Sequence, residues 1–401
     1  MNIGRPIVAI VGPFQFPRGG AAARRVLGNA LMLSEIGYDV IIAAGQKEKS
    51  NRLRSINKFI KMISINERKA EKCPTLIKHL LYINMGKLTV KWLDNLEIKP
   101  KAVILYSGYS PYLLRLVPWC RKNGIPLIFD AVEWYQPNHL QGGGCLGPYR
   151  WNIELAMKIL AVKANNIIAI SRYLQKYYDS KKCQTVRIPP TLDTVKIVPR
   201  IERMNREKIV LCYAGNPGKK DLIIPLLQAM KKIDPDGRRL ELQIVGVDED
   251  EFRSGNRHNR DLDGSIIDKV RFYGKMTYRK TWEIVRNADY SVVIRKPLRY
   301  AQAGFPTKVV ESLALGTPVL CNITSDLGSY IHDGMEGIVS ESWRANDIMN
   351  CLKRIMNTSE AKIVDMRKSA RRCAVENFDF RKYKEKMLAF MKKLPNGGGI
   401  E

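Results

Sequence analysis

Each half of this chain opens with the same order of elements: an apolar strand, a glycine-bearing loop with basic residues, and a helix. In the first half, residues 7–11 (IVAIV) lead into the loop 12–20 (GPFQFPRGG), and a helix is predicted over about 21–36. In the second half, residues 208–214 (KIVLCYA) lead into GNPGKK at 215–220. Alternating β and α elements of this kind predict parallel sheets joined by crossover helices. We therefore expect an α/β protein with two Rossmann-like domains.

The alternation continues through the second half. Asp221 follows the lysine-bearing loop and is expected to cap a helix that ends near Ile233. Apolar runs typical of buried strands follow, each separated by a helical pattern. These runs are residues 240–245, 270–273, 290–294 and 318–321.

The length and composition suit two domains. The chain has 401 residues, 45% of them hydrophobic, which is enough for two ordinary cores. Residues 1–195 are expected to form the first domain and residues 208–375 the second. The charged segment 196–207 contains a proline and lacks a strong period, so it is interpreted as the linker. Residues 376–401 are expected to form a C-terminal helix and tail that pack back toward the first domain.

The composition also limits the function. There are 67 Lys+Arg against 39 Asp+Glu, a net charge of +28, which favours anionic partners such as phosphorylated substrates, lipid surfaces or nucleic acid. The eight cysteines include no CxxC pair and the four histidines lie far apart, so no metal site or disulfide framework is indicated, and a reducing cytoplasm fits. The acidic run 248–251 is interpreted as a solvated surface loop. No signal peptide or membrane-spanning run is predicted, and 153–170, the most apolar candidate, is broken by charged residues.

The segment from Lys47 to Lys101 is strongly basic, with 14 Lys/Arg against 5 Asp/Glu. Four apolar residues recur in it near helical spacing: Ile56, Phe59, Ile60 and Ile63. A basic amphipathic helix with an aliphatic face can lie on an anionic membrane. The alternative is an ordinary helix with a solvated basic face.

The run 305–320 (FPTKVVESLALGTPVL) carries the clearest chemical pattern. A helix is predicted over 307–315, with Pro306 at its start and Gly316 as its stop. The free N–H groups at such a helix start favour a phosphate. Glu311, one turn further along, could accept hydrogen bonds from a ribose. The alternative is an amphipathic helix with an exposed glutamate.

Three motifs together resemble a known family. These are GPFQFPRGG (12–20), YAGNPGKKD (213–221) and FPTKVVESLALGTPV (305–319), and they resemble family 4 glycosyltransferases, which are retaining enzymes of the glycosyltransferase-B fold. The resemblance implies two Rossmann-like domains whose parallel sheets face a deep cleft. It also implies transfer of a sugar from a UDP- or GDP-linked donor to a glycan or lipid-linked glycan acceptor. The second and third motifs look most like members that build bacterial surface polysaccharides, which implies a cytoplasmic enzyme peripheral at the inner face of the membrane.

The resemblance also implies roles for individual residues. Lys220, and next to it Lys219, would stabilise the charge that grows on the leaving diphosphate, whereas the alternative is two solvated lysines. The first domain would contribute Arg18, Gly19 and Gly20 on the acceptor and diphosphate side. No metal or cofactor is expected, because lysine and helix N–H groups supply the positive field. The implied donor-binding set is Gly215, Asn216, Arg295, Phe305, Pro306, Thr307, Lys308 and Glu311.

Two acidic residues follow the apolar strand at 126–129. In open α/β sheets, the carboxyl ends of the strands carry functional groups. Asp130 and Glu133 are therefore candidates for contacting the acceptor hydroxyl. The alternative is a loop with solvated acids and a packed Trp134.

One position departs from the family pattern and keeps other functions open. Ala303 stands where the family commonly has the first of two glutamates, the one that usually contacts the transferred sugar. A non-catalytic glycosyltransferase-like subunit therefore remains an alternative. A basic nucleic-acid-binding protein is the less favoured one, since no RNA- or DNA-binding motif is present.

Overall fold

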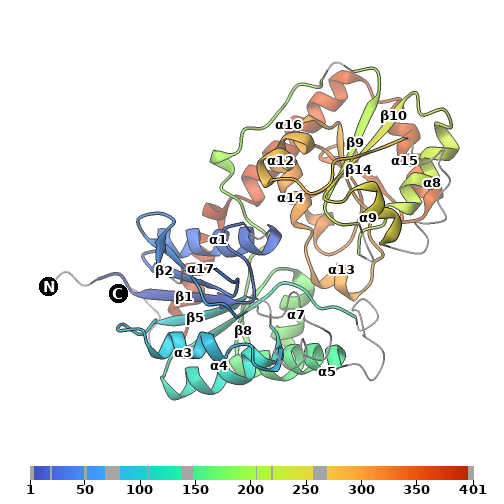
Figure 1. Ribbon diagram of the computed structural model, residues 1–401. Helices are drawn as coiled ribbons and strands as arrows, with labels where there is room; N and C mark the ends of the chain where they lie inside the picture. The colour runs from blue at the N-terminus through green and yellow to red at the C-terminus, as the bar shows by residue number, and fades with distance from the viewer. Residues whose placement is uncertain are drawn as a thin grey trace. The chain divides into compact units, whose positions relative to one another are not determined.

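The chain is described here from a computed structural model, which divides it into two compact units. The first unit combines Met1–Thr191 with Phe380–Glu401, and the second is Leu192–Asp379. Each unit is built on one sheet flanked by helices (Figure 1). The residues that the structure describes are 4–18, 20–48, 52–67, 82–106, 108–136, 148–204, 206–217, 220–255 and 269–395.

The sheet of the first unit has the strand order β3-β4-β2-β1-β5-β6-β7-β8 in the described residues. All neighbours are parallel except β3 and β4. The strands are β1 (Ile7–Gly12), β2 (Asp39–Ala44), β3 (Arg54–Ser55), β4 (Ile60–Ser64), β5 (Ala102–Tyr106), β6 (Leu127–Ala131), β7 (Asn166–Ala169) and β8 (Gln184–Arg187). The helices are α1 (Gly20–Glu35), α3 (Lys87–Asp94), α4 (Ser110–Lys122), α5 (Pro148–Leu155), the π-helix η2 (Ala156–Leu160), α6 (Ala161–Ala164), α7 (Arg172–Ser180), the 3₁₀ turn η5 (Phe380–Tyr383) and α17 (Lys384–Lys392).

The core of the first unit includes residues from both ends of the chain. β1 (IVAIVG) is buried along almost its whole length, as expected for a parallel strand covered on both faces. Side chains of η5 and α17 join α1 in the same cluster, among them Phe380, Met387 and Phe390. The Nε2 of Gln184 in β8 donates to the carbonyl of Phe390 at 2.9 Å. Residues 380–394 therefore complete the core of the unit that the first 191 residues begin.

The amphipathic helix expected within 47–101 is wrong over residues 54–64. These residues form β3 and β4, and β4 pairs in parallel with β2 through Val40 and Ile60. Along β4, Ile60 and Met62 are buried while Lys61 between them is exposed. This alternation has period two, so burial in the sheet prevails over the helical spacing of four apolar residues. Residues 49–51 and 68–81 of the predicted segment lie outside the described residues.

The sheet of the second unit is parallel throughout, with the order β11-β10-β9-β12-β13-β14 in the described residues. The strands are β9 (Ile209–Ala214), β10 (Leu240–Val245), β11 (Val270–Phe272), β12 (Tyr290–Val293), β13 (Val319–Asn322) and β14 (Gly337–Ser340). The helices are α8 (Ile224–Ile233), α9 (Glu249–Ser254), α12 (Tyr278–Asn287), α13 (Arg299–Ala303), α14 (Thr307–Ala314), α15 (Ala345–Met356) and α16 (Glu360–Asn377), with 3₁₀ turns η3 (Thr194–Lys196) and η4 (Leu327–Ser329). The predicted strands of this half are all present, each within one or two residues.

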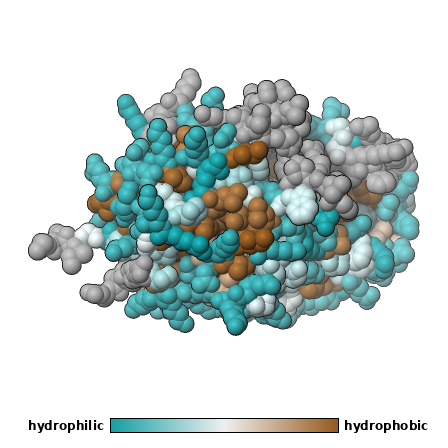
Figure 2. Space-filling view, turned by 90° about the horizontal axis from the view of Figure 1, so that it is seen from below, coloured by the Kyte–Doolittle hydropathy of each residue, from teal (hydrophilic) through white to brown (hydrophobic). Residues whose placement is uncertain are grey.

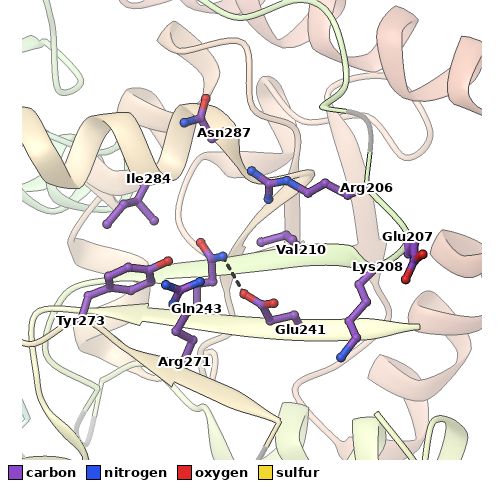
Figure 3. Close-up of a pocket in the computed structure, with 10 residues that line it drawn as sticks. All are labelled: Arg206, Glu207, Lys208, Val210, Glu241, Gln243, Arg271, Tyr273, Ile284 and Asn287. Carbon is purple, nitrogen blue, oxygen red and sulfur yellow. Dashed lines mark hydrogen bonds between the residues drawn. The ribbon is translucent and has the colours of Figure 1, made fainter. Parts of the chain in front are cut away.

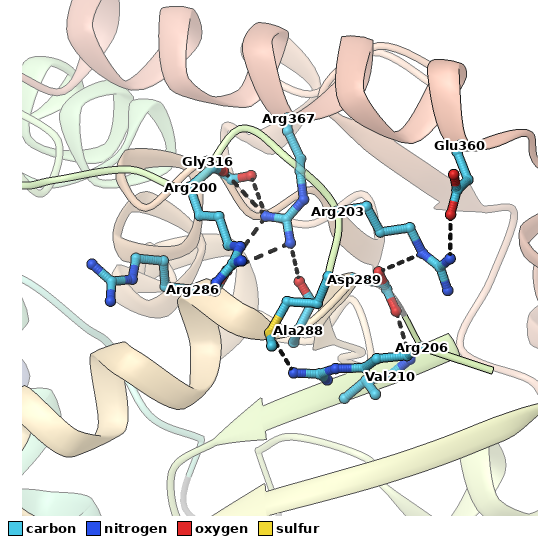
Figure 4. Close-up of polar contacts among 11 residues, drawn as sticks. Arg200, Arg203, Arg206, Val210, Arg286, Ala288, Asp289, Gly316, Glu360 and Arg367 are labelled. Carbon is cyan, nitrogen blue, oxygen red and sulfur yellow. Dashed lines mark hydrogen bonds and ion pairs between the residues drawn. The ribbon is translucent and has the colours of Figure 1, made fainter. Parts of the chain in front are cut away.

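The segment expected to be a linker, 196–207, packs on the second unit instead. The chain enters this unit at Leu192, whose N–H donates to the carbonyl of Phe378 at 2.8 Å. Arg203 Nε contacts Asp289 Oδ1 at 3.0 Å, and its Nη1 contacts Glu360 at 2.9 Å (Figure 4). Arg203, one of the charges that suggested a linker, therefore has its partners on the unit itself. The chain crosses between units at 191–192 and at 379–380.

A fully buried arginine on α16 ties this segment to two helices. Arg367 Nη1 donates to the carbonyl of Gly316 at 3.0 Å, and Nη2 donates to that of Ala288 at 2.5 Å (Figure 4). A weaker bond, at 3.3 Å, reaches the carbonyl of Arg200 in the incoming segment. These carbonyls follow the C-termini of α12 and α14, where the helix dipole favours a cation. Burial lowers the pKa of Arg367 to about 10, which still leaves it charged at neutral pH.

None of the helices in the described residues is long and apolar enough to cross a membrane.

Candidate functional site

Two glycines end neighbouring strands of the second unit and let the backbone pack closely. Gly215 follows β9 with φ of 145°, and a Cβ there would lie 2.7 Å from Nζ of Lys308. Gly246 follows β10 with φ of 123°, and a Cβ there would lie 2.5 Å from the carbonyl oxygen of Gly215. A side chain at either position would collide with its neighbour or strain the backbone. The glycines therefore let the carboxyl ends of the two strands pack closely, at the edge where such sheets usually bind ligands.

A buried charge cluster lies beside Gly215. Asp221 Oδ1 contacts Arg295 Nε at 2.6 Å, and its Oδ2 contacts Lys308 Nζ at 2.6 Å. The hydroxyl of Tyr213 donates to the same Oδ2 at 2.8 Å, and Lys308 Nζ lies 4.0 Å from the centre of the tyrosine ring. The side chains of Asp221, Arg295 and Lys308 are only 7%, 11% and 18% exposed. Among these three side chains, two cations face one anion, which leaves one positive charge in excess in a place that water hardly reaches. The carboxylate of Glu311 on α14 also acts on Lys308 and opposes the lowering of its pKa by burial.

The electrostatics of the cluster follow from its burial. Burial opposes ionisation of Asp221, but the charges of Lys308 and Arg295 outweigh it and hold the pKa of the carboxyl well below its usual range. Burial, and then the Asp221 charge, raises the pKa of Tyr213 well above its usual value, so this hydroxyl stays protonated. Burial lowers the pKa of Lys308, against the raising effect of Asp221.

This arrangement corrects the role expected for Asp221. The helix that follows, α8, begins only at Ile224 with Ile223 as its N-cap residue. Asp221 does not cap it and instead holds Lys308 and Arg295, which are 87 and 74 residues away in the sequence. These two candidates for donor binding are thus engaged by a carboxylate. Asp221 therefore balances one of these two positive charges and leaves the other in excess.

The helix whose start is predicted to bind a phosphate is present in the structure. α14 begins at Thr307, with Pro306 as an N-cap residue whose side chain makes no capping hydrogen bond. Phe305, just before it, packs edge-on against Tyr330 and Phe378, with ring centroids 5.8 and 5.7 Å apart. Glu311, one turn into α14, is 9% exposed. The start of α14 thus carries the positive end of the helix dipole and is preceded by a packed aromatic ring.

The glycine loop after β9 is placed in part. Asn216 is exposed, and the backbone carbonyl of Lys220 accepts a hydrogen bond from the hydroxyl of Tyr300 at 2.8 Å. Tyr300 lies on α13, so this bond joins the loop to the segment just before α14. Lys219 lies outside the described residues. Ala303, at the end of α13, is fully buried.

The candidates of the first unit differ in their surroundings. Asp130, at the carboxyl end of β6, is 1% exposed and forms an ion pair with Arg25 at 2.8 Å, while Asn29 Nδ2 donates to it at 3.0 Å. Arg25 Nη1 also donates to the carbonyls of Ile188 and Pro189. Both carboxylate oxygens of Asp130 are occupied, so the expectation that it contacts an acceptor hydroxyl is not supported by its surroundings. It acts as a positioning residue that fixes α1 against β6 and the end of β8.

The remaining candidates of the first unit are more accessible. Glu133 is half-buried and accepts a hydrogen bond from the hydroxyl of Tyr135. Arg18 is exposed, and Gly20 is the first residue of α1 with φ of 61°. Gly19 lies outside the described residues. Among the described residues, no group of three His, Cys, Asp or Glu side chains is placed to hold a metal ion.

Sequence reasoning missed four residues that hold these groups together: Tyr213, Tyr300, Arg25 and Asn29. Tyr213 sits inside an otherwise apolar strand (IVLCYA), close to its carboxyl end. A hydroxyl in a fully buried strand needs a polar partner, and that requirement was a usable signal. Arg25 lies among the apolar residues of α1, where a buried charge also demands a partner.

Comparisons with known proteins agree with this arrangement. Residues 196–373 match the family model described as "Glycosyl transferases group 1". The D-inositol 3-phosphate glycosyltransferase of Geodermatophilus obscurus is 25% identical over 203 residues, a match that covers 47% of this chain and 44% of that protein. The chain thus aligns with less than half of this relative's length.

Solved structures match over nearly the whole chain. Sucrose-phosphate synthase from Thermosynechococcus elongatus has a TM-score of 0.73 at 16% identity, covering 97% of this chain and 98% of that one. The Anabaena protein Alr3699/HepE in complex with UDP and glucose has a TM-score of 0.65 at 12% identity, covering 97% and 100%. At such identities the likeness shows the fold. The chain has the glycosyltransferase-B fold, and the match to the family model lies in its second unit.

We predict that Asp221→Asn destabilises the second unit by about 3 to 5 kcal/mol at pH 7, because two buried cations lose their anion. The pH dependence should change too. The folded pKa of Asp221 is depressed, so its ionised form stabilises the fold above the unfolded pKa of about 3.9, and this stabilisation is lost as the pH falls below that value. Urea unfolding between pH 7 and pH 3 should give a shallower acid loss for the variant. Asp236→Asn, at an exposed aspartate, is the matched control; equal curves for the two variants would contradict the prediction.

Proposed function

We propose that this protein is a retaining glycosyltransferase of family 4 that moves a sugar from a UDP- or GDP-linked donor to a glycan or lipid-linked glycan. The observation that carries the proposal is the excess positive charge of the Asp221–Arg295–Lys308 cluster, beside Gly215. A group 1 glycosyl transferase domain spans these residues and α14. An anion next to such a cluster is stabilised more than it would be in water, because screening is weak there.

The proposed chemistry uses the donor as its own base. The bond between the anomeric carbon and the diphosphate oxygen breaks, and negative charge grows on the diphosphate. Lys220, with Lys219 next in line, and the first N–H groups of α14 stabilise that charge as it develops, which makes the contact catalytic. The acceptor hydroxyl attacks the same face of the sugar, and its proton passes to the leaving phosphate oxygen. No metal or further cofactor is required by this scheme.

Binding of the nucleotide is assigned to α14 and the loop before it. Glu311 would accept hydrogen bonds from the ribose, with Asn216 and Thr307 as further polar contacts. Arg18, Gly19 and Gly20 of the first unit are assigned to the acceptor and diphosphate side, and Glu133 to the acceptor hydroxyl. Asp130 is not assigned to the acceptor, because Arg25 and Asn29 bond to its two carboxylate oxygens.

Isothermal titration with UDP, GDP and their sugars tests the donor assignment. We expect one of the two nucleoside diphosphates to bind, and Glu311→Gln to weaken that binding about tenfold through loss of a charge-assisted hydrogen bond. Turnover at saturating donor should change little, because a ribose contact is made about equally in the ground and transition states. A chain that bound neither nucleotide would refute the proposal.

Lys220→Ala should lower kcat far more than it weakens donor binding. Loss of a contact to developing charge costs about 2.7 to 4 kcal/mol, or roughly a hundred- to a thousandfold in rate. Lys232→Ala, at an exposed lysine on α8, is the matched control and should keep full activity. Normal turnover by Lys220→Ala would rule out the assigned role. If the unmodified chain bound donor but transferred no sugar to any glycan offered, Ala303 would mark it as a non-catalytic subunit.

The same proposal includes peripheral attachment at the inner face of the membrane, as part of surface-polysaccharide synthesis. The surface that supports it lies on α4, α5 and η2, which pack together in the first unit. Leu114, Trp151 and Ile159 are 51%, 66% and 49% exposed there. Exposed basic residues lie on the same helices and on α6, namely Arg121, Lys122, Arg150, Lys158 and Lys163. Figure 2 views the side that carries α4 and α5, and it shows apolar side chains gathered among hydrophilic ones.

Liposome sedimentation tests this membrane surface. An exposed tryptophan with aliphatic neighbours and a basic rim suits an anionic lipid interface, where each nearby cation contributes about 1 kcal/mol. We expect binding to vesicles that contain phosphatidylglycerol, and a loss of most of it with Trp151→Glu or at high salt. Val198→Glu, at an exposed aliphatic residue of the second unit, is the control. Equal binding to neutral phosphatidylcholine vesicles would argue against the proposal.

A further inference from the structure

One face of the sheet in the second unit is unexpectedly polar near its β11 edge. Along β10 (LELQIV), Leu240, Leu242 and Ile244 enter the core cluster, so Glu241 and Gln243 point to the opposite face. Gln243 is paired in register with Arg271 of β11. Parallel sheets are normally covered by apolar residues on both faces. A polar face here breaks that pattern, and such breaks are typical of functional sites.

This face forms the floor of a concavity of about 460 Å³, within the range of small-molecule sites. The segment before β9 and the helix α12 border it, through Arg206 and Ile284. Figure 3 shows the guanidinium group of Arg271 beside the Tyr273 hydroxyl, and that of Arg206 above Val210. The concavity lies at the first residues of β9, whereas Gly215 follows the last residue of that strand. At about 3.3 Å per residue, the two places are roughly 16 Å apart.

The two arginines lack carboxylate partners within the described part of the chain. Arg206 donates to Met204 Sδ at 2.7 Å, and thioether sulfur is a weak acceptor. Arg271 lies 5.2 Å from the centre of the Tyr273 ring. Burial raises the pKa of Tyr273, so its hydroxyl remains a donor at neutral pH. These three donor groups suit a dianion, for which arginine offers bidentate hydrogen bonds.

Acceptors line the floor next to these donors. Glu241 accepts a hydrogen bond from Gln243 Nε2 at 2.7 Å, which fixes both side chains on the sheet. A carboxylate held in this way can accept further hydrogen bonds from hydroxyl groups. The site thus offers cations for a phosphate and a fixed acid for hydroxyls, side by side.

We propose that this concavity binds a small hydroxylated phosphate monoester, such as a sugar phosphate, at a site separate from the nucleotide-sugar site. The phosphate lies between Arg206 and Arg271 and accepts from the hydroxyl of Tyr273. A hydroxyl of the same ligand donates to Glu241. Because the site lies at the opposite end of β9, its ligand and a nucleotide do not compete.

Isothermal titration of the full chain with glucose 6-phosphate, glucose and inorganic phosphate tests the site. We expect glucose 6-phosphate to bind, glucose not to bind, and phosphate to bind at least tenfold more weakly because it cannot reach Glu241. Arg206→Gln and Arg271→Gln should each weaken glucose 6-phosphate binding by at least about tenfold. Arg279→Gln removes an exposed arginine of α12 outside the concavity and should leave binding unchanged. Thermal unfolding of each variant serves as the check on folding.

The titration is repeated in saturating UDP and in saturating GDP. Unchanged binding of glucose 6-phosphate supports a separate site, and the result holds whether or not a nucleotide binds. Displacement by either nucleotide would overturn the proposal, as would equal weakening in Arg279→Gln. Equal affinity for phosphate and glucose 6-phosphate would overturn the role given to Glu241. Failure of all three probes to bind would overturn the site itself, while leaving the nucleotide-sugar proposal intact.

Discussion

The carboxylate of Asp221 is the constraint on which the second unit's ligand edge depends. It joins the glycine loop to Arg295 after β12, to Lys308 at the start of α14, and to Tyr213 at the end of β9. Each of these groups would be costly to bury alone, and together they are satisfied with one positive charge left over. The cluster therefore fixes the geometry of the edge, and the charge left over is the basis for proposing that an anion binds there. Structure and electrostatics depend here on the same two ion pairs.

The other end of α14 is fixed in a complementary way. Arg367 donates to the carbonyl of Gly316, and Arg371, one turn along α16, donates to those of Ala314 and Thr194 at 2.8 Å each. Guanidinium groups at the C-terminal end of α14 stabilise the negative end of its dipole. The same arginines hold the incoming segment through the backbone carbonyls of Thr194 and Arg200.

The sequence predicted the local elements well and the long-range polar contacts poorly. β1, β9 and α14 follow from apolar runs, glycines and a proline, all of which are local signals. The role of Asp221 did not follow, because a cap is a contact within a few residues and its actual partners are 74 and 87 residues away. The basic run at 54–64 has apolar residues near helical spacing and therefore favours a helix, whereas β4 within it alternates with period two. The glycosyl transferase motifs located the candidate site, but which side chains neutralise one another there required the fold.

The return of the chain to the first unit has a consequence for biosynthesis. Phe380, Met387 and Phe390 fill part of the core around α1. In the sequence, the whole second unit lies between α1 and these residues. During synthesis, α1 is made before the second unit, and the residues that cover it are made after that unit. Until then, the face of α1 that receives α17 is exposed to water or to other proteins. The second unit can therefore complete its own core before the first unit does.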